Sequence, residues 1–167
     1  MNTLEIELAV AGYFDFRANT IVPNISWGLN LHEIDVLVLT KSGYAYEVEI
    51  KTTKADLVRD SKKKHGHRSS RIKRLYFAVP ESLAQIALTI IPIGAGLLTI
   101  KEEGGFTRAK LIKPPSQNSQ VRPLNPDERL KLHELATMRL WNMKRILLSR
   151  LQEIQRLHKI CDNAGIA

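Results

Sequence analysis

Two stretches of alternating apolar and polar residues, joined by a three-residue turn, constrain the fold of this chain more than any other feature. Residues 32–40 and 44–52 show the alternation that is typical of β-strands. The turn between them ends in Gly43, and a hairpin loop of this length favours a residue that tolerates left-handed backbone. The sequence therefore predicts an antiparallel hairpin in which residues equally far from Ser42 face each other.

The predicted register brings two carboxylates together on one face of the hairpin. Asp35 faces Glu49, and the Cβ atoms of directly opposed residues lie about 4.5–5.5 Å apart. Like charges at this distance repel each other, so a bound cation would stabilise the pair. Oxygen ligands suit Mg²⁺ or Mn²⁺ better than zinc, and a lysine on the same face, Lys51, is placed to neutralise charge on a scissile phosphate. The pattern predicts metal-dependent hydrolysis of a phosphate ester.

The hairpin also has a purely structural explanation. Its other face is wholly apolar and consists of Ile34, Val36, Val38, Tyr46, Val48 and Ile50. The charged face is then expected to be solvated, with Lys51 paired to Glu33 or Glu47. A shift of one residue in the register would separate Asp35 from Glu49. The hairpin alone leaves these interpretations open.

The excess positive charge of the chain is concentrated directly after this hairpin. The chain has 25 Lys and Arg against 17 Asp and Glu, a net charge of +8. Residues 51–74 contain ten of the basic residues and two of the acidic ones, so this segment accounts for the whole excess. Such a segment attracts polyanions, of which nucleic acid is the commonest inside cells, although a solvated basic loop has the same composition.

Seven residues of this basic segment are predicted to contact the backbone of DNA. They are Lys54, Lys62, Lys64, His65, His67, Arg68 and Arg71. Contacts to phosphate position a nucleic acid without reading its sequence. The sequence therefore predicts DNA as the partner and gives no sequence preference.

The remaining periodicity predicts an α/β sheet with helices on its faces, one domain over residues 1–112. Helices are expected at residues 3–14, about 56–64 and 82–91, and further strands at residues 75–80, 95–100 and 105–113. Residues 113–125, rich in Pro, Ser and Gln, predict a linker, and residues 126–160 predict one long C-terminal helix.

The predicted C-terminal helix carries an apolar stripe. Its positions step by three and four residues and are Leu140, Met143, Leu147, Leu151, Ile154 and Leu157. A stripe of this kind needs a partner, which is either the body of the domain or the same helix of another copy. A homodimer through this helix is therefore one expectation.

Several classes of protein are not expected. The single cysteine, Cys161, excludes a disulfide framework, and the apolar runs are too interrupted for a membrane span. The sequence has no Gly-rich phosphate-binding loop, so no nucleotide cofactor is expected. With acidic residues near its start in place of a basic leader, the chain is expected in the cytoplasm, of a bacterium or a phage-infected cell, or otherwise inside the cell.

The order of these features resembles the PD-(D/E)XK nuclease superfamily, and within it the small Holliday-junction-resolvase-like and MmcB-like DNA-repair or phage proteins. The matching residues are Asp35 and the triplet Glu49-Ile50-Lys51. They are followed by TTKADLVRDSKKKHGH and RLYFAVP, which are similar to the segments after the active strand in that group. The resemblance covers residues 1–112, and it departs from the family pattern at Ile34, where a proline usually precedes the aspartate.

The resemblance implies a restriction-endonuclease-like mixed central sheet flanked by helices, here with a long C-terminal helix added. It implies that Asp35 and Glu49 bind Mg²⁺ or Mn²⁺ together with the carbonyl of Ile50. Lys51 would be the catalytic lysine, and a glutamate of the first helix, Glu5 in preference to Glu7, would complete the site.

The expected function is a metal-dependent endonuclease that hydrolyses phosphodiester bonds of DNA, with structured DNA in repair or recombination as the substrate that the resemblance implies. Two alternatives remain. One is a non-catalytic DNA-binding module on the same fold, and the other is a dimeric assembly protein whose long helix pairs.

Overall fold

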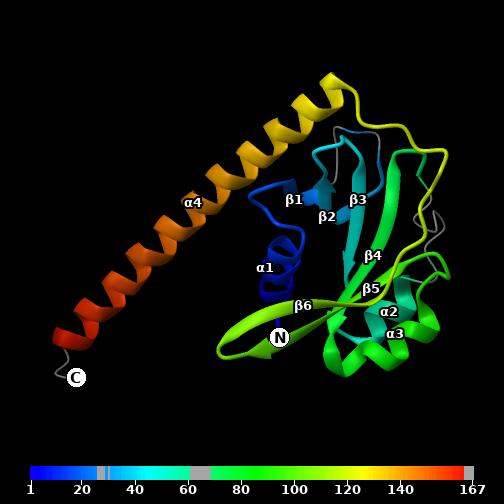
Figure 1. Ribbon diagram of the computed structural model, residues 1–167. Coiled ribbons are helices and arrows are strands. Elements are labelled where there is room, and N and C mark those ends of the chain that lie inside the picture. The colour runs from blue at the N-terminus through cyan, green and yellow to red at the C-terminus, as the bar shows by residue number, and fades with distance from the viewer. Residues whose placement is uncertain (26–28, 30, 61–68, 164–167) are drawn as a thin grey trace.

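A six-stranded mixed sheet forms the centre of the protein in a computed structural model, which describes residues 1–25, 29, 31–60 and 69–163 (Figure 1). The strands are β1 (Thr20–Ile25), β2 (Ile34–Leu39), β3 (Ala45–Ile50), β4 (Ile72–Pro80), β5 (Gly96–Glu103) and β6 (Phe106–Lys113). The helices are α1 (Thr3–Tyr13), α2 (Lys54–Asp60), the short 3₁₀ helix η1 (Glu81–Leu83), α3 (Ala84–Ile90) and α4 (Pro126–Asn163).

The strands lie across the sheet in the order in which they occur in the sequence. β2 pairs antiparallel with β1 and with β3, and β5 pairs antiparallel with β6. β4 lies parallel to both of its neighbours, which requires the crossovers made by α2 and α3. The predicted α/β class, with a mixed sheet, flanking helices and a long C-terminal helix, is confirmed.

Both faces of the sheet are covered. α1 packs on one face, where Ile6 and Val10 lie against apolar residues of β2 to β5. α2 and α3 pack on the other face over β4 and β5, and the start of α4 packs on that same face over β1 and β2. The carboxylates predicted to face each other belong to this second face.

The hairpin of β2 and β3 has the predicted register. Val36 pairs with Val48 and Leu37 with Glu47, positions equally far from the turn. Gly43 has a positive φ of 82°, the left-handed backbone for which the sequence supplies a glycine. The prediction of the pairing is therefore confirmed.

The alternative interpretation, in which the polar face of this hairpin is solvated, is wrong for Glu47 and Glu49. Glu47 is 0% exposed and Glu49 is 1% exposed, because helices cover this face as well. Alternation along the strands shows two different faces but does not show whether a later helix covers the polar one. A buried carboxylate must be paired or neutralised, which makes the surroundings of these two residues informative.

Several elements differ from the sequence prediction. β1 was not expected, because Pro23 interrupts it and its alternation is weak; it lies at the edge of the sheet, where a missing N–H is tolerated. β4 begins at Ile72, three residues before the predicted start. The predicted helix over residues 56–64 corresponds to α2, which begins earlier, and residues 61–64 lie outside the described part of the chain.

The predicted linker is fastened to the domain along its length. Ser116 donates its backbone N–H to Gly94 (2.8 Å), and Asn118 donates to Lys73 (3.0 Å). Leu124 is buried and donates its N–H to the carbonyl of Gly43 in the hairpin turn (2.8 Å). The segment therefore crosses the domain as a fixed strap and brings the start of α4 to the turn of β2 and β3.

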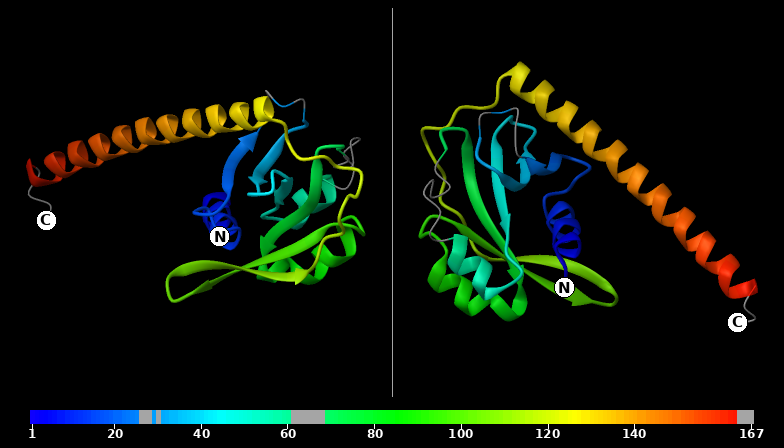
Figure 2. Two further views of the ribbon diagram at one scale, coloured as in Figure 1. Left: turned by 45° about the horizontal axis from the view of Figure 1, so that its top comes forward. Right: turned by 180° about the vertical axis from the view of Figure 1, so that it is seen from behind.

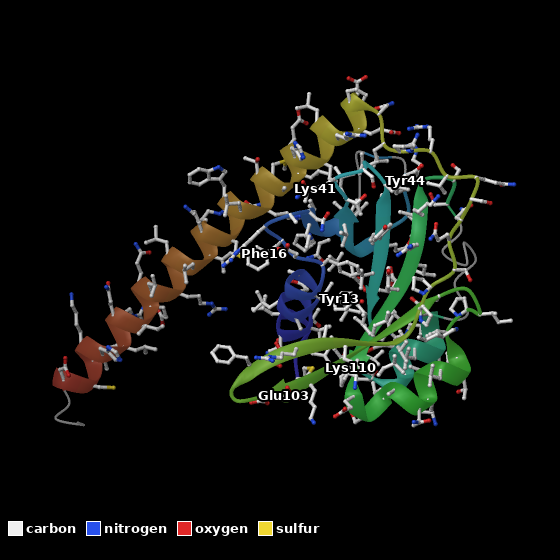
Figure 3. All side chains as sticks on the ribbon, in the orientation of Figure 1. Tyr13, Phe16, Lys41, Tyr44, Glu103 and Lys110 are labelled. Atoms are coloured by element: carbon white, nitrogen blue, oxygen red, sulfur yellow. The ribbon has the colours of Figure 1, made fainter. Side chains whose placement is uncertain are left out.

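α4 has two parts with different surroundings. Leu132 and Leu135, in its first turns, are buried against β1 and β2. The later part of the helix runs away from the body of the domain, and its apolar stripe is exposed (Figures 1 and 2). Side chains of this distal part stand clear of the sheet in Figure 3. None of the helices in the described ranges is long and apolar enough to cross a membrane.

The start of α4 is held by a carboxylate network. Asn125 and Glu128 form a reciprocal cap, in which each accepts the backbone N–H of the other at 2.8 Å. The Glu128 carboxylate also accepts two hydrogen bonds from Arg122 (2.8 and 2.9 Å) and lies 3.2 Å from Arg71. Hydrogen bonding by Arg122, with further contributions from Asn125 and the two positive charges, lowers the pKa of Glu128 to about 2 despite its burial.

We expect the substitution Glu128→Gln to destabilise the protein by about 1–2 kcal/mol at pH 7, because it removes a charge-assisted pair but keeps the capping geometry. A carboxylate with a lowered pKa stabilises the fold above its ordinary pKa and loses that contribution as the pH falls toward 2. The difference between variant and wild type should therefore shrink below about pH 5. Urea unfolding at stepped pH measures it.

The matched control is Glu134→Gln on the same helix. Glu134 pairs with Lys131 at an exposed position (2.9 Å), so its loss should change the free energy of unfolding by less than about 0.5 kcal/mol. Equal stabilities of the Glu128→Gln variant and the wild type at pH 7 would contradict the role given to this network.

Candidate active site

Three carboxylates surround the ammonium group of Lys51 at one end of the sheet. Lys51 directly follows β3, and its Nζ lies 2.5 Å from Glu49 Oε2, 3.1 Å from Asp60 Oδ1 and 3.5 Å from Asp35 Oδ2. Asp35 is near the start of β2, which lies beside the end of β3 because the two strands are antiparallel. The structure therefore brings together Asp35, Glu49 and Lys51, as the hairpin register predicts. We refer to these four side chains as the Lys51 cluster.

Asp60 was not singled out by the sequence analysis. It is the last residue of α2 and is 5% exposed. Leu57, one turn earlier, is buried in the core, so residue 60 lies on the same inward face of the helix. An acidic residue three positions after a core leucine is the signal that would have indicated a buried carboxylate.

The position of α2 follows from the residues that link it to β3. The backbone N–H of Lys51 donates to the carbonyl of Ala78 in β4 (3.0 Å), which extends the strand pairing past β3. Thr53 then accepts the N–H of Asp56 at 3.1 Å and donates its hydroxyl to that carboxylate, which caps the start of α2. The helix thus begins four residues after the end of β3, and its last turn reaches Lys51.

The electrostatics of the cluster favour a charged lysine. Burial by itself lowers the pKa of Lys51, because an ammonium loses hydration in the interior. The charge and hydrogen bond of Glu49, and the charges of Asp35 and Asp60, outweigh that effect and raise the pKa above its ordinary value. Lys51 is therefore protonated at physiological pH.

Asp35 is the member of the cluster that reaches solvent. Its side chain is 36% exposed, whereas that of Glu49 is 1% exposed. Its Oδ2 accepts the backbone N–H of Ile50 (2.8 Å), so the strand itself orients the carboxylate. A ligand that enters the cluster would meet Asp35 first.

Glu7, and not Glu5, is the glutamate of α1 that lies close to this cluster. Burial and the negative charge of Asp35 raise the pKa of Glu7, although a hydrogen bond from Asn24 acts in the opposite direction. The Glu5 carboxylate accepts the N–H of Asn2 (2.6 Å) in the capping box of α1. Residues two apart on a helix point to different sides, so Glu7 is the α1 glutamate that interacts with Asp35, and the site role expected for Glu5 stays a prediction.

A second buried pair lies on the same sheet face. His32 Nε2 is 2.8 Å from Glu47 Oε1, and Glu47 lies two residues before Glu49 in β3. One alternative from the sequence pairs Glu47 with Lys51, whereas the structure pairs Glu47 with His32. The spacing of residues 32 and 47 does not indicate this contact, because His32 lies in the loop before β2, outside the hairpin pairing.

The predicted DNA contacts are placed only in part. Lys62, Lys64, His65, His67 and Arg68 lie outside the described residues. Lys54 is exposed at the first residue of α2. Arg71 is engaged within the protein, because its guanidinium donates to the carbonyl of Leu29 and pairs with Glu128. For Arg71 the structure therefore gives an anchoring role that the sequence did not indicate.

The fit of a divalent ion depends on the two carboxylates that share Lys51. Within the described ranges no group of three or more His, Cys, Asp or Glu side chains is arranged to hold a metal ion. Asp35 and Glu49 nevertheless both lie within 3.5 Å of the same nitrogen, so an ion at that point would contact both. The residues fit a hard cation with oxygen ligands, provided that the ammonium moves aside.

A polar hollow elsewhere on the molecule does not belong to this cluster. It has a volume of about 500 Å³ and is lined by residues around the start of β4 and the strap, among them Ser70, Lys73 and Asn118. The Lys51 cluster lies at the other end of β3 and β4. The chemistry suggested by the carboxylates is therefore not located in this hollow.

Comparison with known proteins shows a similarity of fold to one solved structure. No protein-family model and no curated protein sequence matches the chain. A protein of unknown function from Silicibacter pomeroyi has a similar structure, with a TM-score of 0.59 and 20% sequence identity over 85% of this chain and 88% of that chain. At this level of sequence identity the likeness concerns the fold alone.

Proposed function

We propose that this protein is a metal-dependent endonuclease that hydrolyses phosphodiester bonds of DNA. The observation that carries the proposal is the convergence of Asp35 and Glu49, from two adjacent strands, on the ammonium of Lys51. Two acids and a lysine at the end of a β-hairpin match the residues on which the resemblance to PD-(D/E)XK nucleases rests. The fold, a mixed sheet with crossover helices, is compatible with that family.

Asp35 and Glu49 would hold Mg²⁺ or Mn²⁺, with the carbonyl of Ile50 as a further ligand in the resembled family. When bound, such an ion polarises a phosphate and makes a water more acidic. The N–H of Ile50 keeps the Asp35 carboxylate oriented toward this position. Lys51 remains charged and would stabilise the negative charge that develops on the phosphate.

The proposal of DNA as substrate depends on the basic segment. The Lys51 cluster lies within the first part of this segment, because Asp60, at the end of α2, contacts Lys51 and the densest run of basic residues follows Asp60 directly in the sequence. A phosphate backbone drawn to those charges would therefore lie near Asp35, the exposed member of the cluster. A substrate with a junction or flap, in repair or recombination, follows from the resemblance.

We expect the full-length protein to cut plasmid or branched DNA with Mg²⁺ or Mn²⁺ and to lose activity when the metal is chelated. Asp35→Asn and Lys51→Met should each reduce the rate by about 100-fold or more, because the first removes a charged ligand of the metal and the second removes a positive charge that acts on the reacting phosphate. Gel assays of single-turnover cleavage measure this.

Matched controls are Asp127→Asn, in the first turn of α4, and Lys41→Met, in the exposed hairpin turn. Both should cut at the wild-type rate. Melting curves establish that the four variants are folded. Unchanged cutting by Asp35→Asn and Lys51→Met would defeat the proposed mechanism.

A non-catalytic DNA-binding module is the second candidate, and one observation favours it. The Lys51 ammonium already neutralises the repulsion between Asp35 and Glu49 without any metal. In that case the protein would bind DNA with an affinity that falls steeply with salt and would cut none of the substrates with either metal.

The exposed stripe of distal α4 favours a dimeric protein, and this is compatible with either DNA-related function. We expect sedimentation to show a dimer that dissociates in the double variant Leu147→Glu, Ile154→Glu, because two charges would enter the apolar contact. Ser149→Glu, away from the stripe on the same helix, should remain dimeric. A wild-type protein that is monomeric at micromolar concentrations would exclude pairing through α4.

A further inference from the structure

The three carboxylates around Lys51 belong to two different groups. Asp35 and Glu49 lie on the paired strands β2 and β3, and they are the proposed metal ligands. Asp60 comes from α2, which follows Lys51 in the sequence, and it has no counterpart among the residues of the motif. The contact of Asp60 with Lys51, at 3.1 Å, is therefore the one that a metal would leave intact.

The Lys51 ammonium lies between one oxygen of each proposed metal ligand. Nζ is 2.5 Å from Glu49 Oε2 and 3.5 Å from Asp35 Oδ2, so an ion that takes these two oxygens displaces it. Lys51 is only 8% exposed, and a buried ammonium without an acidic partner is strongly destabilised. The ease of metal entry therefore depends on where the ammonium goes.

We propose that Asp60 is a positioning residue that receives the Lys51 ammonium when a divalent ion takes Asp35 and Glu49. This inference rests on the proposed function. The movement is short, because Nζ already contacts Asp60 and the backbone of Lys51 is fixed by its hydrogen bond to Ala78. Asp60 thereby holds the ammonium beside the proposed metal position, instead of letting it compete with the metal for Asp35 and Glu49.

The surroundings of Asp60 suit this role. Leu57 is buried and fixes the orientation of the last turn of α2, while the cap at Thr53 fixes its beginning. The carboxylate is therefore held by the helix at a constant distance from the end of β3. An acid on a flexible surface loop would not give the ammonium a defined second position.

The test is a double-mutant cycle on Mn²⁺ binding, measured on the full chain without DNA by the loss of the free-ion signal in electron paramagnetic resonance. Asp60→Asn should weaken Mn²⁺ binding roughly tenfold when Lys51 is present, because the displaced ammonium loses a charged partner. In the Lys51→Met background the same substitution should change the affinity by less than about twofold, because no ammonium has to move.

The control is Asp56→Asn, which removes the same charge from the same helix. Asp56 pairs with Arg59 (3.5 Å) and bonds to Thr53, so its effect should be small and equal in both backgrounds. Melting curves verify folding. Where Asp60→Asn does not fold, Asp60→Glu replaces it and should show a smaller loss that is again confined to the Lys51 background.

Equal losses for Asp60→Asn in both backgrounds would reveal a general effect of charge, and they would overturn the role of Asp60 while leaving the metal site intact. No loss in the Lys51 background would overturn it too. Absence of Mn²⁺ binding by the wild type, or binding unaffected by Asp35→Asn, would refute the metal site of the proposed function and this inference together.

Discussion

The buried ion cluster around Lys51 joins three parts of the chain and fixes their relative positions. Its carboxylates come from β2, β3 and α2, so the hairpin and the first crossover helix meet at one ammonium group. Removal of one partner from such a cluster leaves a buried charge uncompensated, and this is strongly destabilising. The position of α2 is therefore determined by charge as well as by the apolar contact of Leu57.

Within the basic segment, the described residues on both sides of residues 61–68 are anchored by opposite charges. Asp60, before that stretch, contacts Lys51, and Arg71, after it, contacts Glu128 at the start of α4. Arg71 also donates to the carbonyl of Leu29 in the loop before β2. The strap and the start of α4 are thus connected to the sheet, since the backbone N–H of Leu124 donates to the turn of the β2–β3 hairpin.

Local sequence patterns predicted the hairpin and its register, whereas tertiary packing determined which of its side chains are buried and what they contact. Gly43 and the alternation around it were sufficient for the register that places Asp35 opposite Glu49. The burial of Glu47 and Glu49 was not predictable, because it depends on helices that arrive later in the chain. His32 was missed for the same reason, since no short-range spacing connects it with Glu47, whereas the inward position of Asp60, one turn after Leu57, was a signal present in the sequence.

The sequential order of the strands has a consequence for how the molecule acquires its structure. Each strand from β2 to β6 pairs with the strand that precedes it in the sequence. The antiparallel pairs close short loops, whereas the two parallel pairs of β4 must first close the longer crossovers that contain α2 and α3. Because closing a longer loop costs more chain entropy, we expect the β2–β3 hairpin to form before β4 joins it, and α4, which packs on β1 and β2, follows all six strands in the sequence.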